Sequence, residues 1–181
     1  EFNAVFLDGA RAARGDVVGA PGEGWRIALA LLGFERGVST LGQQMGFARD
    51  LDLVVALARE NGAARNPAIR RRIARAWAGL RAMRCMALRM LSETPDSQAK
   101  LESLGYKYQW SNWRRDLGRL GMDVAGLTGA VDGSDPRIGR LRRLFFFSRA
   151  DTVYGGTNEI QLNLLAERGL GMPKEPRGRA G

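Results

Sequence analysis

The sequence contains no histidine and a single cysteine, Cys85. Without histidine, imidazole-based catalysis and the common zinc sites are excluded. A single cysteine excludes any disulfide within the chain, so a reducing compartment such as the cytoplasm is expected. No apolar run is long enough to cross a bilayer. The first residue is Glu1 rather than Met and no signal peptide is recognisable, so we expect a fragment or a processed chain.

Basic and apolar residues are abundant. The 28 Lys and Arg residues outnumber the 19 Asp and Glu residues, for a formal charge of +9, and 45% of the 181 residues are hydrophobic. This length fits one domain or a domain with an appendage, and the apolar content is enough for a core. The positive charge suits a nucleic acid, an anionic cofactor or an acidic partner domain.

The first 24 residues differ in pattern from the rest. The run 5–7 (VFL) predicts a short strand, and the Gly and Pro residues after it predict a loop. Because a lone strand cannot form a sheet, residues 1–24 are interpreted as the end of another domain and its linker. Residues 25–172 have helical periodicity, and residues 173–181 are expected to be a disordered tail.

Four long helices and a short one are predicted. The first runs from Trp25 to about Asn61-Gly62, and the second begins with Asn66 as N-cap and Pro67 in the first helical position. The others are expected to open at Thr94-Pro95 and to span residues 137–152 and 157–170. The apolar stripe of the first helix is expected to comprise Leu31, Phe34, Val38, Leu41, Met45, Ala48, Leu51, Val55 and Ala58. The predicted fold is all-α, an antiparallel bundle of four to five helices.

The stretch VYGGTNEIQ, residues 153–161, places two glycines directly before the last predicted helix. The N-terminus of a helix has free N–H groups and the positive end of the helix dipole. Gly155 and Gly156 therefore allow a substrate or cofactor to approach the backbone closely. From the residues alone, an ordinary glycine turn before a helix is the alternative.

Three segments, in this order, carry a family resemblance: NAVFLDGARAARGDVVGAPGEGW, LLGFERG and SRADTVYGGTNEIQLNLLAERGLGMP. Together they resemble the C-terminal half of acyl-CoA dehydrogenases over nearly the whole chain. The resemblance implies the C-terminal helical bundle of such an enzyme, with residues 1–24 as the end of its middle β domain. It also implies FAD as cofactor, an acyl-CoA substrate, an electron-transfer flavoprotein as electron acceptor, and a homodimer or homotetramer. The isolated domain is expected to be inactive.

In such enzymes a carboxylate removes the α-proton of the thioester and the flavin takes a hydride from the β-carbon, which yields a trans-2-enoyl-CoA. The resemblance implies that the N–H of Gly155 donates to the thioester carbonyl, where charge develops. It places Thr157 and Glu159 against FAD, and Tyr154 and Gly156 beside the substrate.

A further contact implied by the resemblance is Arg59, in ARENG, which would reach the FAD pyrophosphate of a neighbouring subunit. This segment lacks the Phe that usually follows the arginine in the family, and a solvated arginine at a helix end is the alternative. The family's glycine-rich FAD segment is not recognisable in LGMDVAGLTG.

The catalytic base is the main departure from the family, because many members have a glutamate where this chain has Gly155. Other branches have the base on the first helix of this domain, at the position of Glu35 in GFERG. Glu35 lies four residues after Leu31 and three before Val38, so it belongs to the apolar stripe, where partial desolvation raises its pKa. An ion pair with a neighbouring arginine is the alternative. Arg36 is expected to orient the site, or else to be a structural or solvated arginine.

Two other functions stay open from the sequence. With Gly155 in place of the acid, the chain fits a non-catalytic subunit whose active site lies on a homologous partner. The basic stretch RRRIARAWAGLRAMR fits a helix that follows the phosphates of a nucleic acid, although no known nucleic-acid-binding module is apparent.

Overall fold

The computed structural model describes residues 4–92, 100–131, 133 and 135–174, and the side chains of residues 32–41, 92 and 100–102 lie outside that description. The chain forms two compact units, Glu1–Arg36 and Gly37–Gly181. Helix α1 (Gly24–Glu60) begins in the first unit and ends in the second. Within the described ranges, no helix is both long and apolar enough to cross a membrane.

The first unit contains no strand among its described residues, so the prediction of a strand at residues 5–7 is wrong. Val5, Phe6 and Leu7 are 80%, 84% and 74% exposed. A strand exists through hydrogen bonds to a neighbouring strand, and the described chain offers none. A short 3₁₀ turn, η1 (Arg14–Asp16), follows this segment before α1 begins.

The connection between the first two helices confirms the predicted boundary. Helix α1 ends at Glu60, and Gly62 has a φ of +78°, the left-handed conformation typical of the residue after a helix. Helix α2 (Pro67–Ser92) then begins with Asn66 as its cap, because Asn66 Oδ1 accepts a hydrogen bond of 2.8 Å from the Ala68 N–H. Local chemistry therefore determines both ends of this turn.

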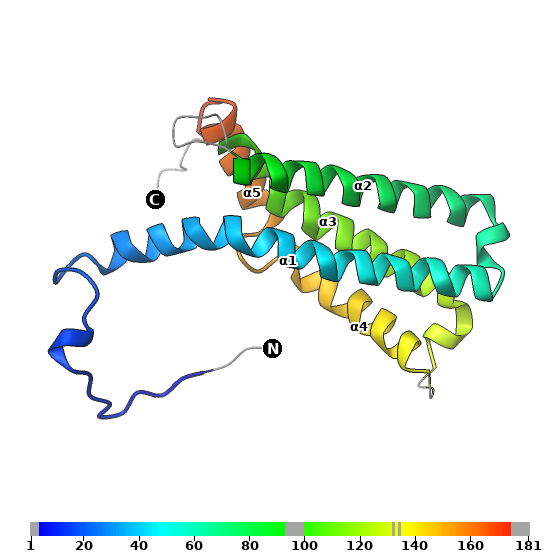
Figure 1. Ribbon diagram of the computed structural model, residues 1–181, viewed down its shortest axis with the longest axis horizontal. Helices are drawn as coiled ribbons and strands as arrows, with labels where there is room; N and C mark the ends of the chain where they lie inside the picture. Colours follow the sequence, from blue (N-terminus) through cyan, green and yellow to red (C-terminus); the bar gives the residue numbers. More distant parts are fainter. Residues whose placement is uncertain (1–3, 93–99, 132, 134, 175–181) are drawn as a thin grey trace, which may run out of the picture. The chain divides into compact units, whose positions relative to one another are not determined.

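The remaining elements are α3 (Lys100–Ala125), η3 (Gly126–Gly129), α4 (Pro136–Ala150), α5 (Asn158–Leu164) and the π-helical turn η4 (Leu165–Gly169). The predicted opening of the third helix at Thr94-Pro95 and the tail beyond residue 174 lie outside the described residues. Helix α3 is the centre of the second unit, since it packs against α2, α4 and α5. Figure 1 shows α2 and α3 running antiparallel. The predicted all-α bundle is confirmed.

Helix α4 is tied to the end of α1 by charge. Asp135 caps α4 by accepting the N–H of Arg137, and the Arg137 guanidinium also donates to Glu60 at 2.6 Å. This hydrogen bond is the main reason why the pKa of Glu60 lies below its usual value. The contact is exposed, so its contribution to the stability of the fold is small.

The core lies where α1 and α3 face each other. The ring centroid of Phe47 is 6.0 Å from that of Trp110 and 5.5 Å from that of Trp113. Other buried side chains of this core include Leu51, Val54, Met83, Leu117, Leu120, Leu141 and Leu144. The predicted stripe of α1 is only partly correct, because Leu31 and Met45 are 68% and 63% exposed. The side chains of its members Phe34, Val38 and Leu41 lie outside the described residues. Residues 51–58 of α1 are apolar on several sides, so periodicity alone does not define which side is buried.

Candidate active site

The loop between α4 and α5, residues 151–157, contains the two glycines of the sequence motif. The N–H groups of Val153 and Tyr154 both donate to the carbonyl of Ala150, which continues the end of α4 into a tight turn. Gly155 has a φ of +62° and Gly156 a φ of +92°, a region that other residues rarely occupy. A Cβ on Gly156 would also lie 2.5 Å from Nε2 of Gln161. The backbone conformation therefore favours glycine at both positions.

The carbonyl and amide groups of this loop have different environments. The carbonyl of Gly155 accepts from Gln161 Nε2 at 3.1 Å, and that of Gly156 accepts from Lys107 Nζ at 2.9 Å. In contrast, the N–H groups of Gly155 and Gly156 make no hydrogen bond within the described part of the chain, and Gly155 is exposed. The loop therefore presents free donors that suit an oxyanion.

A buried carboxylate anchors the loop. Asp151 is fully buried; its Oδ1 accepts from the Tyr154 hydroxyl at 2.6 Å, and its Oδ2 lies 2.8 Å from Nη1 of Arg114. Burial raises the pKa of Asp151, while the Tyr154 hydroxyl and the charges of Arg114 and Lys107 act in the opposite direction. The ammonium group of Lys107 also donates to the main-chain carbonyl of Asp151 at 2.6 Å.

Tyr154 is a neutral hydrogen-bond donor in this arrangement. Its partial burial, followed by its hydrogen bond to Asp151 and the charge of that residue, raises the pKa of the phenol to about 12. The phenol proton is held by Asp151, so Tyr154 is unsuited to serve as a base near neutral pH.

The partners that hold this loop were not predicted from the sequence. Asp151 and Tyr154 are three residues apart, a spacing that brings two side chains together in a helical turn, so their contact could have been predicted from the sequence. Lys107 and Arg114 belong to α3 and meet the loop only in the folded chain.

The two predicted FAD contacts lie directly after the glycines. Thr157 is the N-cap of α5, and its Oγ1 accepts from the N–H of Ile160 at 3.3 Å. Glu159 is exposed in the first turn, and hydrogen bonds from its own N–H and then from Thr157 lower its pKa. The structure therefore brings together Tyr154, Gly155, Gly156, Thr157 and Glu159.

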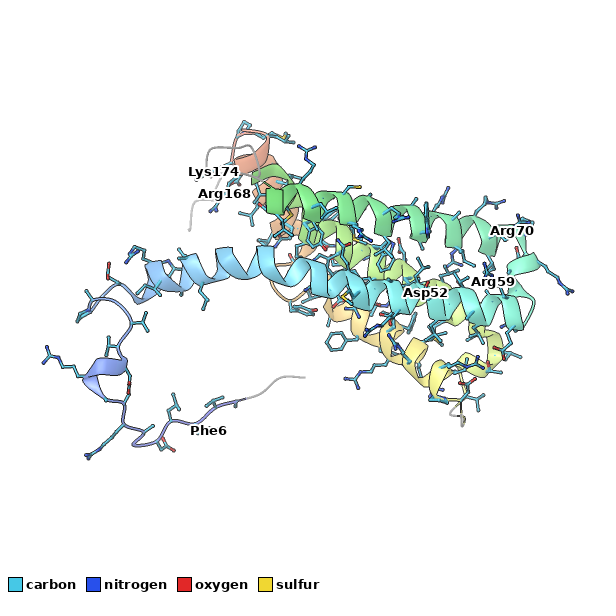
Figure 2. All side chains as sticks on the ribbon, viewed as in Figure 1. Phe6, Asp52, Arg59, Arg70, Arg168 and Lys174 are labelled. Carbon is cyan, nitrogen blue, oxygen red and sulfur yellow. The ribbon has the colours of Figure 1, made fainter. Side chains whose placement is uncertain are left out.

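Arg59 lies at the other end of the bundle. It lines a cavity of about 630 Å³ between α1 and α2, together with Arg70 and Trp77, and Figure 2 shows Arg59 and Arg70 near the turn that joins these helices. The neighbouring Asn61 donates to the carbonyl of Val124, whereas the glycine loop contacts Lys107. These two points are 17 residues apart on α3, which corresponds to about 25 Å along the helix axis.

Comparison with known proteins decides the family. Residues 22–170 match the model of the acyl-CoA dehydrogenase C-terminal domain. The chain belongs to the acyl-CoA dehydrogenase family. It is 52% identical over 178 residues to acyl-CoA dehydrogenase IpdE1 of Mycobacterium tuberculosis (strain ATCC 25618 / H37Rv) and 49% identical to IpdE1 of Mycolicibacterium smegmatis (strain ATCC 700084 / mc(2)155). Each match extends over 98% of this chain but over only 46% and 44% of the two relatives. The chain therefore spans less than half of their length.

Solved structures of this family share the fold. The Tcur3481-Tcur3483 steroid ACAD is 28% identical with a TM-score of 0.72, over 84% of this chain and 40% of that one. The glutaryl-coenzyme A dehydrogenase glutaryl-CoA complex also has a TM-score of 0.72, over 91% of this chain and 42% of that one. Its identity is 19%, so it supports the fold alone.

Two further candidate residues of this acyl-CoA dehydrogenase domain belong to a different element from the loop. Glu35 and Arg36 belong to α1 at the end of the first unit, in the segment whose side chains lie outside the described residues. Their roles stay predictions. No group of three or more metal-ligating side chains is found in the described part of the chain.

Replacing Gly155 by alanine is expected to destabilise the full-length protein by roughly 1–2 kcal/mol, because an L-residue at this φ is strained. A clash is not the cause, since the nearest atom to the added Cβ, Cε of Lys107, is 3.9 Å away. Gly139→Ala is the matched control: Gly139 is exposed in α4 with no atom near its Cβ position, so alanine there should stabilise by up to about 1 kcal/mol. Urea unfolding of both variants measures the difference, and equal effects would contradict the strained conformation of Gly155.

Proposed function

We propose that this chain is the C-terminal domain of an FAD-dependent acyl-CoA dehydrogenase that converts an acyl-CoA thioester to its trans-2-enoyl-CoA. One observation carries the proposal: Gly155 is exposed and its N–H makes no hydrogen bond within the described residues, in a loop held by its carbonyls. A family member needs such a donor, because removing an α-proton places negative charge on the thioester oxygen.

Two residues of this chain are proposed to act on the thioester, one on its carbonyl oxygen and one on its α-proton. The Gly155 N–H donates to the thioester oxygen and stabilises the charge that develops there. Glu35, in α1, is proposed to take the α-proton, since Tyr154 is committed to Asp151 and has a pKa of about 12. FAD, when bound, supplies the acceptor for the β-hydride.

The residues present fit a flavin cofactor at two separate places. Thr157 and Glu159 lie beside the glycine loop, whereas Arg59 lines a cavity together with Arg70 and Asp52. Two cations against one carboxylate leave a net positive charge, which suits a pyrophosphate. About 25 Å of α3 separates these places. This separation supports a homodimer or homotetramer in which Arg59 of one subunit serves the cofactor bound at the loop of another. The same proposal includes an electron-transfer flavoprotein as acceptor and the cytoplasm as location.

A second candidate is a non-catalytic subunit of a heteromeric acyl-CoA dehydrogenase. Gly155 favours it, because no acid stands at the position that many family members use. The two-part name of the related steroid ACAD also fits an enzyme of two chains, and it makes steroid-derived acyl-CoA thioesters the first substrates to test.

Anaerobic flavin titration of the full-length protein tests these proposals. The protein is purified alone and together with a homologous subunit, its flavin spectrum is recorded, and straight-chain, branched and steroid-derived acyl-CoAs are added. We expect one class of thioester to bleach the oxidised flavin band. A colourless protein would overturn the FAD assignment. A yellow protein that bleaches only with the homologous subunit present would replace the first candidate by the second.

A further inference from the structure

Lys107 of α3 lies half-buried against the glycine loop. Its ammonium donates to the carbonyl of Asp151 at 2.6 Å and to that of Gly156 at 2.9 Å. Its Cε lies 3.9 Å from the position that a Cβ on Gly155 would occupy. The Lys107 side chain therefore links the carbonyls of Asp151 and Gly156 across the turn and passes beside Gly155.

Such a contact matters here because glycine restricts the backbone less than any other residue, and the loop has two of them in a row. A peptide plane turns as a unit, so holding a carbonyl also orients the N–H on the same plane. Gln161 holds the plane that carries the Gly155 carbonyl and the Gly156 N–H, and Lys107 holds the next one. On the other side of Gly155, Tyr154 is anchored through its hydroxyl to Asp151. The Gly155 N–H lies on the plane that carries the Tyr154 carbonyl, between these contacts. They therefore limit its orientation from both sides without bonding that plane itself.

The chemistry of this position favours lysine. Only three of the 28 basic residues are lysines, so arginine is the usual cation of this chain. An ammonium is compact and has three N–H donors, which suits two carbonyls that converge on one point, whereas a guanidinium presents a rigid planar fork. Aromatic rings line the site, with Nζ 5.7 Å from the ring centroid of Trp110 and 5.8 Å from that of Tyr154.

We propose that Lys107 is a positioning residue, which holds residues 151–156 in the conformation that presents the Gly155 N–H to the thioester oxygen. The proposal rests on the function proposed above for its catalytic consequence. Its structural part stands on the two hydrogen bonds of Lys107 and is testable without any substrate.

The test compares Lys107→Met with Lys174→Met in the full-length protein. Methionine keeps most of the aliphatic stem but donates no hydrogen bond, and Lys174 is an exposed lysine far along the sequence. Hydrogen exchange by mass spectrometry reports on the peptide that covers residues 151–157. We expect roughly tenfold faster exchange there in Lys107→Met, with unchanged exchange in α1 and in the Lys174→Met control.

The second measurement is the rate of flavin reduction after rapid mixing. It uses the acyl-CoA that bleaches the flavin of the wild type. The rate constant should fall by about 10- to 100-fold in Lys107→Met, while the acyl-CoA concentration for half-saturation changes less than about threefold, because the donor acts mainly in the transition state. If Lys107→Met does not fold, Lys107→Arg takes its place. This variant keeps the positive charge but replaces the ammonium by a planar guanidinium, and the exchange and flavin-reduction measurements are repeated on it.

The outcomes separate the two proposals. Unchanged exchange at residues 151–157 would overturn the positioning role. Faster exchange with an unchanged rate of flavin reduction would overturn its link to catalysis. If no thioester bleaches the wild type, the proposed function fails, and the exchange result alone decides whether Lys107 holds the loop.

Discussion

Glu35→Gln in the full-length protein is expected to lower the rate of flavin reduction by about two to four orders of magnitude, while FAD stays bound. General-base catalysis contributes an effect of this size, and glutamine keeps the shape of the side chain but cannot accept the α-proton. Anaerobic rapid mixing with acyl-CoA measures the rate, and the flavin absorbance of the purified variant measures cofactor content.

Glu23→Gln is the matched control for this experiment. Glu23 is a glutamate just before α1 whose partners are local, the N–H of Ala20 and the guanidinium of Arg26. Its replacement should leave the rate within about twofold, since its side-chain contacts are confined to the segment around the start of α1. A Glu35→Gln variant as fast as the wild type would remove Glu35 from the mechanism, and the non-catalytic-subunit proposal would then gain support.

Asp151→Ala is expected to destabilise the protein by about 3–5 kcal/mol, the cost of breaking a buried ion pair by removing one partner. Asp151 has no exposed surface, and its loss leaves Arg114 without its carboxylate and the Tyr154 hydroxyl without its acceptor. Asp151→Asn should cost less, because the amide oxygen can still accept from Tyr154. Urea unfolding of the full-length variants measures these losses.

Asp116→Ala provides the comparison on an exposed pair. Asp116 lies on α3, 3.6 Å from Arg119, with 69% of its side chain exposed, so its replacement should change stability by less than about 0.5 kcal/mol. Equal losses for Asp116→Ala and Asp151→Ala would show that the buried carboxylate does not anchor the loop.

The pH dependence of the Asp151 variants has a defined sign. Because burial raises the pKa of Asp151 in the folded protein above its ordinary value of 3.8, the native state binds this proton more readily than the unfolded state. This contribution to stability is fully present below that ordinary pKa and is lost as the pH rises through the folded pKa. The stability of wild type relative to Asp151→Asn should therefore fall as the pH is raised from about 4. An increase over this range would contradict the raised pKa.

Local chemistry made several features predictable. Asn66 and Pro67 mark the start of α2, and Gly62 follows the end of α1, because capping and left-handed turns depend on a few adjacent residues. The glycine pair at 155–156 was likewise recognisable, since the backbone there adopts a conformation that other residues avoid. The family was also recognisable from the sequence, because the motifs of acyl-CoA dehydrogenases are short, continuous segments.

Other features depended on contacts between distant segments. Periodicity placed Met45 on the buried side of α1, but the packing of Phe47 against two tryptophans of α3 determines which side faces the core.

By itself, the sequence determined the helical architecture, the limits of α1 and α2 at their shared turn, the glycine loop and the family, because each depends on neighbouring residues. Only the tertiary structure decided that Lys107 and Arg114 of α3 meet Asp151, and that Arg59 lies at the opposite end of the bundle from Gly155. The physical reason is that a buried charge is stabilised by whichever partner the fold brings near it, and sequence spacing does not contain that distance.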